Sequence, residues 1–308
     1  MKIFVKVSVV VLLAFTASGQ QDPMLTQYMF NGLYLNPAYA GSHEYWSSTL
    51  SYRSQWVGAT FDGAPQTVIA AVDGPVRGKN IGLGFIASHD RIGVTRTTTF
   101  MADYAYQIKL NDKSKLALGL NAGVAQYSSN LTEVLVWDEG DEIYANNQNK
   151  VLPRIGFGMY YFSKRYYIGA SIPTLLAYED GNDFSMDLSR GTFLSRHYLF
   201  TAGIVLDVSE NVKFKPSVLL KYTRNAPVEG DLNFSAVFRD MFWIGATYRT
   251  GDAAAILLEY RSNNFFRIGY SYDITFSGLR SYQSGSHEIM IGIDFGKDLI
   301  KVKTPRYF

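Results

Sequence analysis

The stretch TTTFMADYAYQI, residues 97–108, decides the fold class of this chain. Its even positions carry Thr98, Phe100, Ala102, Tyr104, Tyr106 and Ile108, whereas its odd positions include the polar Asp103 and Gln107. A β-strand points successive side chains to opposite faces, so this stretch predicts a strand with one apolar and one polar face.

The same alternation recurs along most of the chain, for example in DLNFSAVFR (231–239) and FRIGYSYDIT (266–275). It predicts about fourteen strands. We expect them at 45–56, 65–73, 80–88, 95–108, 115–126, 153–162, 165–172, 197–208, 211–222, 231–238, 241–249, 253–261, 265–275 and 286–295.

The first 19 residues have the pattern of a secretory signal peptide. Lys2 and Lys6 precede an apolar run from Val7 to Phe15, and Ala17 and Gly19 form a small-x-small cleavage pattern. The run is too short for a membrane anchor helix, which needs about 20 apolar residues. We expect the mature chain to begin near Gln20.

No later segment is apolar for long enough to form a membrane helix, so a membrane location would require a closed barrel. Alternation alone also fits a soluble sandwich, and the connections help to decide. They are mostly tight after the even-numbered strands, longer on the whole after strands 3, 5 and 7, and very long near 127–152 and 173–196; that around Gly251–Asp252 is an exception. Short turns on one rim and long loops on the other are typical of bacterial outer-membrane barrels, whose short rim is periplasmic. We therefore predict an all-β transmembrane antiparallel β-barrel over 45–308, in the outer membrane of a Gram-negative bacterium, with both termini periplasmic.

Composition agrees with this prediction. Tyr, Phe and Trp make up 15% of the chain, as expected where rings lie at membrane interfaces. The 29 basic and 27 acidic side chains nearly balance, which argues against a nucleic-acid partner. The absence of cysteine excludes disulfides and thiolate metal sites.

The inward faces are expected to carry charges of both signs, at Arg53, Asp103, Arg249, Glu259, Arg261, Arg267, Asp273 and Asp294. Such a lumen is either a water-filled pore or a paired network that holds a plug. Residues 20–44 are aromatic, contain two prolines and lack the alternation, so we expect an N-terminal plug or a periplasmic segment there.

A search for chemistry finds little. The four histidines lie in no nucleophile-elbow or metal-binding pattern, and Ser195 near His197 is better explained as a polar loop residue. The acidic run 137–142 lacks the ligand spacing of a calcium loop. The pairs Gly82/Gly84 and Gly156/Gly158 lie inside predicted strands and indicate close packing in the barrel wall. We expect no enzyme activity, no cofactor and no metal.

Several motifs resemble one known family, the PorP/SprF membrane proteins of the type IX secretion system. They are QDP (21–23), QYMFN (27–31), YLNPAYAG (34–41), YRSQW (52–56), GAP (63–65), DGP (73–75), RHY (196–198), NVKFKPS (211–217), YRTGDA (248–253), SGSHEIM (284–290) and TPRYF (304–308). The resemblance covers nearly the whole mature chain, and the loops near 127–150 and 173–195 match poorly.

The resemblance implies an outer-membrane component of this secretion system that supports export or surface anchoring of one secreted protein, often a large adhesin, through its C-terminal sorting domain. Partners would then be that substrate, other secretion components and outer-membrane lipid. Tyr28, Phe30, Asn36, Pro37 and Tyr39 would contact the lumen or a periplasmic partner. The residues Arg53, Gln55, Trp56 and Pro65 around the first hairpin would either hold a plug or only shape the rim. A passive porin or a hydrophobic-ligand channel is the alternative.

Overall fold

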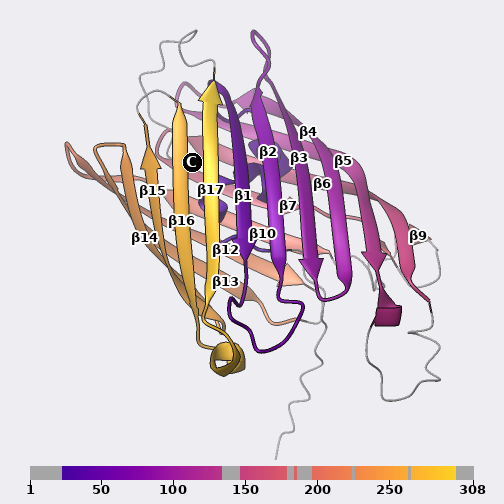
Figure 1. The fold of residues 1–308 in the computed structure, drawn as a ribbon. Coiled ribbons are helices and arrows are strands. Elements are labelled where there is room, and N and C mark those ends of the chain that lie inside the picture. Colours follow the sequence, from indigo (N-terminus) through magenta and orange to yellow (C-terminus); the bar gives the residue numbers. More distant parts are fainter. Residues whose placement is uncertain are drawn as a thin grey trace, which may run out of the picture.

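A computed structural model of the protein describes residues 23–133, 146–178, 184–185, 196–223, 226–262 and 265–295. One antiparallel sheet dominates it (Figure 1). Its strands are β1 (Trp46–Ser54), β2 (Gln66–Pro75), β3 (Ile81–Ile92), β4 (Thr95–Lys109), β5 (Ser114–Ser129), β6 (Gln148–Ser163), β7 (Tyr166–Ile172), β10 (His197–Ile204), β11 (Leu206–Ser209), β12 (Val212–Thr223), β13 (Glu229–Phe238), β14 (Phe242–Arg249), β15 (Ala253–Arg261), β16 (Phe266–Thr275) and β17 (Ser286–Phe295).

The sheet closes into a barrel. Each wall strand pairs with the next wall strand along the chain, and β1 pairs with β17 along its whole length. Both β10 and β11 pair with β12, and Val205 between them interrupts a single wall strand. The barrel therefore has fourteen wall strands, which confirms the predicted fold class.

The strand ends differ from the prediction in two places. Strand β5 ends at Ser129 rather than the predicted 126, and β6 begins at Gln148 rather than the predicted 153. Strand β3 ends at Ile92 rather than the predicted 88, whereas β4 begins at Thr95 as predicted, so only Gly93 and Val94 connect them. The expectation of a longer connection after the third strand was wrong, because polar residues continue the ladder past the apolar part of each strand. A small separate hairpin pairs β8 (Ala177–Tyr178) with β9 (Phe184–Ser185).

The two rims of the barrel differ. One, here called the tight-turn rim, carries the connections 76–80, 110–113, 164–165, 210–211, 239–241 and 262–265. The other, the loop rim, carries 55–65, 93–94, 130–147, 173–196, 224–228, 250–252 and 276–285, with the short helices η3 (Leu131–Glu133) and η5 (Gly278–Tyr282). In Figure 1 the loop rim is at the bottom.

The two faces of the wall have opposite character. In β17 the side chains of Ile289, Ile291 and Ile293 are exposed on the outside, whereas Glu288 and Met290 are buried inside. Together the wall strands form an apolar outer band, as expected of a barrel that is surrounded by lipid hydrocarbon. No helix within the described ranges is long and apolar enough to cross a membrane.

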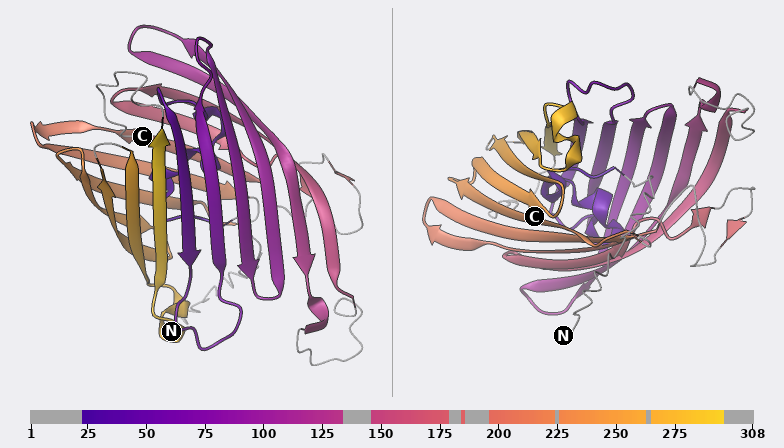
Figure 2. Two further views of the ribbon diagram at one scale, coloured as in Figure 1. Left: turned by 45° about the horizontal axis from the view of Figure 1, so that its top comes forward. Right: turned by 90° about the horizontal axis from the view of Figure 1, so that it is seen from below.

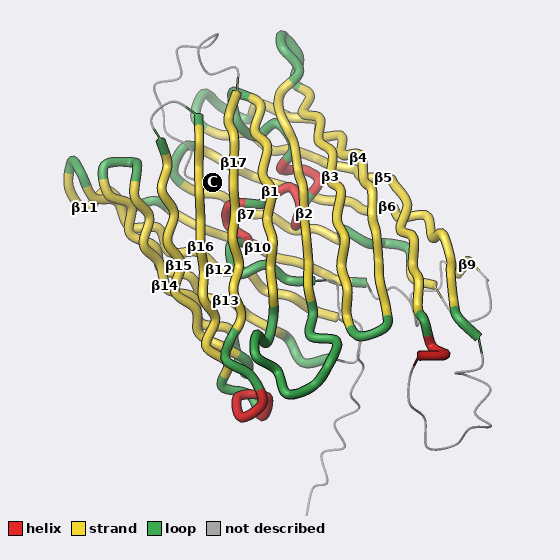
Figure 3. Tube along the Cα trace, in the orientation of Figure 1, coloured by secondary structure: helices red, strands yellow, loops and turns green. Residues whose placement is uncertain are grey.

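The lumen is filled by the N-terminal part of the chain. Residues 23–45, here called the plug, form three short helical turns: η1 (Tyr28–Phe30), α1 (Gly32–Leu35) and η2 (Pro37–Tyr39). Seen from the loop rim they lie inside the ring of strands (Figure 2), and the tube in Figure 3 shows them as helices surrounded by strands. Their apolar side chains build two buried clusters with inward residues of the wall.

Candidate functional site

The site is the interface between the plug and the inner wall. The plug begins at Pro23, which lies in the loop half near Ser88 and His197. It ends in the tight-turn half, where the Gly41 amide donates to Asp73 at 2.9 Å and Gln107 donates to the Gly41 carbonyl at 2.5 Å. Tyr45 then leads into β1.

Arg53 connects the plug to two acidic wall residues. Its Nη2 donates to Asp273 at 2.8 Å and its Nη1 to Glu288 at 3.2 Å. The same Nη1 donates to the Thr26 hydroxyl of the plug at 2.8 Å. All of these side chains are fully enclosed, so each charge depends on its partners rather than on water.

Glu288 also holds the plug backbone directly. Its two carboxylate oxygens accept from the amides of Thr26 and Gln27, at 2.7 and 3.1 Å. The Thr26 hydroxyl in turn donates to Asp273 at 2.6 Å, and the Gln27 side chain donates to the Glu288 carbonyl. One turn of the plug is therefore fixed by charge-assisted bonds, which are the strong kind.

Aromatic contacts fix the middle of the plug. The Phe30 ring meets the edge of Trp243 at 5.4 Å between centroids. Lys215 and Arg261 lie over the same indole, at 5.1 and 5.0 Å from its centroid. This is a cation–π arrangement in which the wall supplies both the cations and the ring that receives the plug.

Two tyrosines of the plug, Tyr28 and Tyr39, contact the wall at two further places. The Tyr28 hydroxyl lies 3.5 Å from that of Ser217. The Tyr39 ring packs edge-on against Tyr160, at 5.5 Å, and against His43 of the plug itself.

Asn36 and Pro37 pass over a track of wall glycines. The Asn36 amide donates to the Met159 carbonyl at 2.9 Å, while its oxygen caps η2 by accepting from the Ala38 amide. A Cβ placed on Gly119 would lie 2.1 Å from the Ala38 nitrogen, and one on Gly158 would lie 2.0 Å from the Asn36 oxygen. Any larger residue in either place would therefore collide with the plug.

The remaining predicted residues lie elsewhere. Gln55, Trp56 and Pro65 belong to the rim loop 55–65, where the Gln55 amide donates to the Pro65 carbonyl at 2.9 Å. Trp56 adopts a positive φ of 52°, and its amide donates to Ser286. Of the four residues around the first hairpin, Arg53 contacts the plug, and the other three shape the rim.

Sequence reasoning missed several contacts. Thr26 and Gln27 were not singled out, nor were Glu288 and Trp243. The glycine pairs in β3 and β6 predicted close packing in the wall, and the partner in that packing is the plug: a Cβ on Gly82 would overlap the Ala40 carbonyl. The signal for this was present, because inward glycines at strand positions leave space that something must fill.

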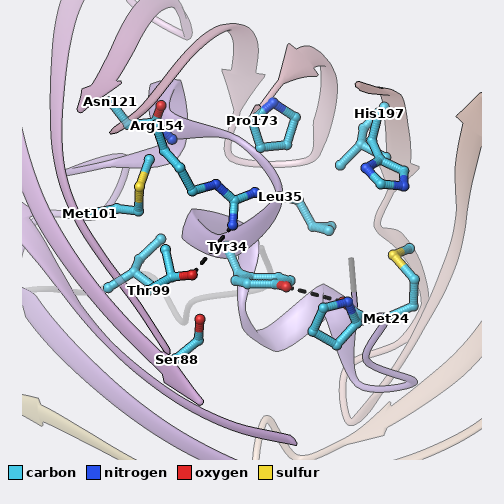
Figure 4. A pocket seen from close by; sticks show the side chains of 13 residues that line it. Met24, Tyr34, Leu35, Ser88, Thr99, Met101, Asn121, Arg154, Pro173 and His197 are labelled. Atoms are coloured by element: carbon cyan, nitrogen blue, oxygen red, sulfur yellow. Dashed lines mark hydrogen bonds between the residues drawn. The ribbon is translucent and has the colours of Figure 1, made fainter. Parts of the chain in front are cut away.

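A small cavity remains between the plug and the wall in the loop half of the barrel (Figure 4). Its volume is about 50 Å³, and its lining is mixed, with Met24, Leu35 and Met101 beside Arg154 and His197. Arg154 donates to Thr99 at 3.4 Å and also bonds Thr174, while the Tyr34 hydroxyl donates to the Pro23 carbonyl.

Within the described ranges, no group of three or more His, Cys, Asp or Glu side chains could hold a metal ion. Ser195 and the acidic run 137–142 lie outside the described residues. His197 is buried at the start of β10.

One protein family matches most of the chain. Residues 17–293 match the family model described as type IX secretion system membrane protein PorP/SprF. No curated protein matches the chain.

Among solved structures, the CymD monoaromatic hydrocarbon channel is 12% identical, covers 88% of this chain and 92% of its own, and has a TM-score of 0.49. A FadL homologue from Pseudomonas aeruginosa is 10% identical, with coverages of 90% and 95% and a TM-score of 0.46. Omp33 from Acinetobacter baumannii is 7% identical, with coverages of 82% and 98% and a TM-score of 0.45.

Proposed function

The chain belongs to the PorP/SprF family of type IX secretion system membrane proteins, and from this premise we propose that it serves one secreted protein, exporting it or anchoring it at the cell surface. In this role it binds the C-terminal sorting domain of that protein, and the protein we propose is a large adhesin. The family itself indicates an outer-membrane component of the secretion apparatus.

The filled lumen is the observation that supports a binding role over a diffusion role. A porin needs a continuous aqueous path, yet the described plug is buried against the wall from Leu25 to Ala40. Charged side chains of the inner wall around the plug form ion pairs: Arg53 with Asp273 and Glu288, and Arg249 with Asp231. A barrel closed in this way offers its rims, rather than a pore, to other molecules.

The loop rim supplies the surface for the secreted protein. Its first and last loops are tied together, because the Val57 amide donates to the Gly285 carbonyl at 2.8 Å and the Ser284 amide to Val57 at 2.7 Å. Val57, Phe61 and Tyr282 are exposed on these loops. An ordered loop pair with exposed apolar side chains fits a protein partner.

A gene deletion tests the proposal. We expect one protein with a C-terminal sorting domain to be lost from the cell surface, and to return when the wild-type chain is restored. The same protein should be recovered with the chain from detergent-solubilised membranes. If every such protein is still secreted and retained at the surface after deletion, the proposal is wrong.

A hydrophobic-ligand channel is the second candidate, and the cavity between the plug and the wall in the loop half is the feature that suggests it. That cavity is about 50 Å³, whereas pockets for small ligands usually hold about 300–1,000 Å³. A ligand would thus require the plug to move. Purified chain in planar bilayers should stay silent if the binding role is correct, and stable ion conductance would favour the channel.

A further inference from the structure

Two arginines face outward from the barrel near the loop rim. Arg91 of β3 and Arg96 of β4 are direct partners in the strand register, and both are exposed. They share the outer face with Phe85 and Phe100, which lie further from the loop rim on the same two strands. These two rings stack on each other, with 6.5 Å between their centroids.

These are the only Lys, Arg, Asp or Glu residues on the outer face of the described wall strands. The other charged residues of these strands alternate into the lumen, as Arg53 and Glu288 do, or lie at the tight-turn rim, as Lys115 does. Two like charges side by side on an otherwise uncharged surface call for an explanation.

Their height corresponds to the lipid headgroups. Further from the loop rim lies the pair His89 and Thr98, hydrogen-bonded at 2.9 Å, and beyond that pair Ala87 and Phe100 begin the apolar band. Four residues along a strand span roughly 13 Å, which a tilt of about 40° reduces to roughly 10 Å of height. The guanidinium groups therefore lie just beyond the hydrocarbon.

A bound anion would relieve the repulsion between the two arginines. Like charges directly opposite each other on a sheet are destabilising, and neither arginine has an ion-pair partner among the described residues. Guanidinium groups bind phosphate oxygens through two parallel hydrogen bonds. Polar side chains continue the row on both sides, with Gln66 beside Arg91 and Ser128 beside Arg96.

We propose that Arg91 and Arg96 bind the phosphate of a phosphorylated glycolipid in the outer leaflet of the membrane. The two guanidinium groups hold one phosphate between them, the polar row contacts the sugar, and the acyl chains lie along the apolar face of β3 and β4. The glycolipid follows from the position at the loop rim, since short turns face the periplasm in bacterial barrels.

The test compares lipids and variants on the purified full-length chain in detergent. Native mass spectrometry would measure binding of lipid A, of lipid A dephosphorylated by a phosphatase, and of phosphatidylglycerol. The double variant Arg91→Gln/Arg96→Gln removes the pair. The matched control Arg77→Gln/Lys79→Gln removes two exposed cations at the opposite rim.

We expect the wild-type chain and the control to prefer lipid A, and the double variant to bind it at least about tenfold more weakly, as the loss of a charge-assisted bond predicts. Dephosphorylation should cause a similar loss. Equal binding by the double variant, an equal loss in the control, or equal binding of phosphatidylglycerol would each overturn the proposal. Heat-modifiable migration on gels verifies that each variant is a folded barrel.

Discussion

Replacing Arg53 with methionine tests how the plug is held. Methionine keeps most of the length of the side chain and removes its charge. Asp273 and Glu288 then remain enclosed without the cation that lies 2.8 and 3.2 Å away from them. Glu288 still accepts from the two plug amides, and Arg249 still lies 3.7 Å from Asp273.

The magnitude follows from burial. Removing one partner of a buried ion pair costs about 3–5 kcal/mol, and the remaining contacts favour the lower end. The cost applies to the plugged state alone, because water that enters an open lumen hydrates both carboxylates. About 3 kcal/mol shifts the ratio of plugged to open barrels roughly a hundredfold, at about 1.4 kcal/mol per factor of ten.

Cysteine labelling gives the readout, because the chain has no cysteine of its own. Met29 is 6% exposed and lies within the plug, so Met29→Cys should react slowly with a membrane-impermeant maleimide. Adding Arg53→Met should raise the labelling rate roughly a hundredfold. The matched control is Arg165→Met, whose exposed pair with Asp207 is worth at most about 1 kcal/mol.

A second variant separates loss of the plug from loss of the barrel. Thr26→Val removes plug-side bonds to Arg53 and Asp273 and leaves the wall charges paired with each other. It should also speed labelling, by less than Arg53→Met. If Met29→Cys stays as protected in both backgrounds as in the parent, while gels show a folded barrel, the ion network does not hold the plug.

Three further variants probe the wall. Gly119→Val should displace the plug and speed labelling, because a Cβ there meets the Ala38 backbone, whereas Gly278→Ala has open space and should change nothing. Trp243→Ala should lower stability to urea by about 3–5 kcal/mol, as for other buried aromatic residues; a loss below 1 kcal/mol would contradict the packing. Ile291→Arg should cost about 2–4 kcal/mol if that side chain faces hydrocarbon, measured as unfolding in lipid vesicles. An unchanged unfolding midpoint would contradict the outward assignment.

The strand pattern could be predicted from the sequence because each wall strand alternates between two different surroundings. The apolar face of β16, from Phe266 to Ile274, meets lipid, and its polar face meets an enclosed interior. The prediction failed at strand ends, where β3, β5 and β6 continue over residues that are mostly polar and do not alternate clearly. Hydropathy carries no signal there, and only the backbone ladder decides where the strand stops.

The position of the plug could not be predicted, because its partners are distant in the chain. Thr26 and Glu288 are separated by 262 positions, and Arg53 and Asp273 by 220. The inward charges left two possibilities open, a wet pore or a plugged lumen. Only the closed geometry brings Arg53, Thr26 and the two acids to one point.

The wall itself argues that the plug is a permanent part of the barrel. Gly82, Gly119 and Gly158 come from three different strands, and each leaves room for the plug backbone or its Asn36 side chain. An inward glycine weakens a strand and adds nothing to an aqueous pore. The same strand positions become useful when a backbone must approach closely. The interior is thus shaped for the segment it contains, and a partner that entered the lumen would have to displace both the ion network and this fit.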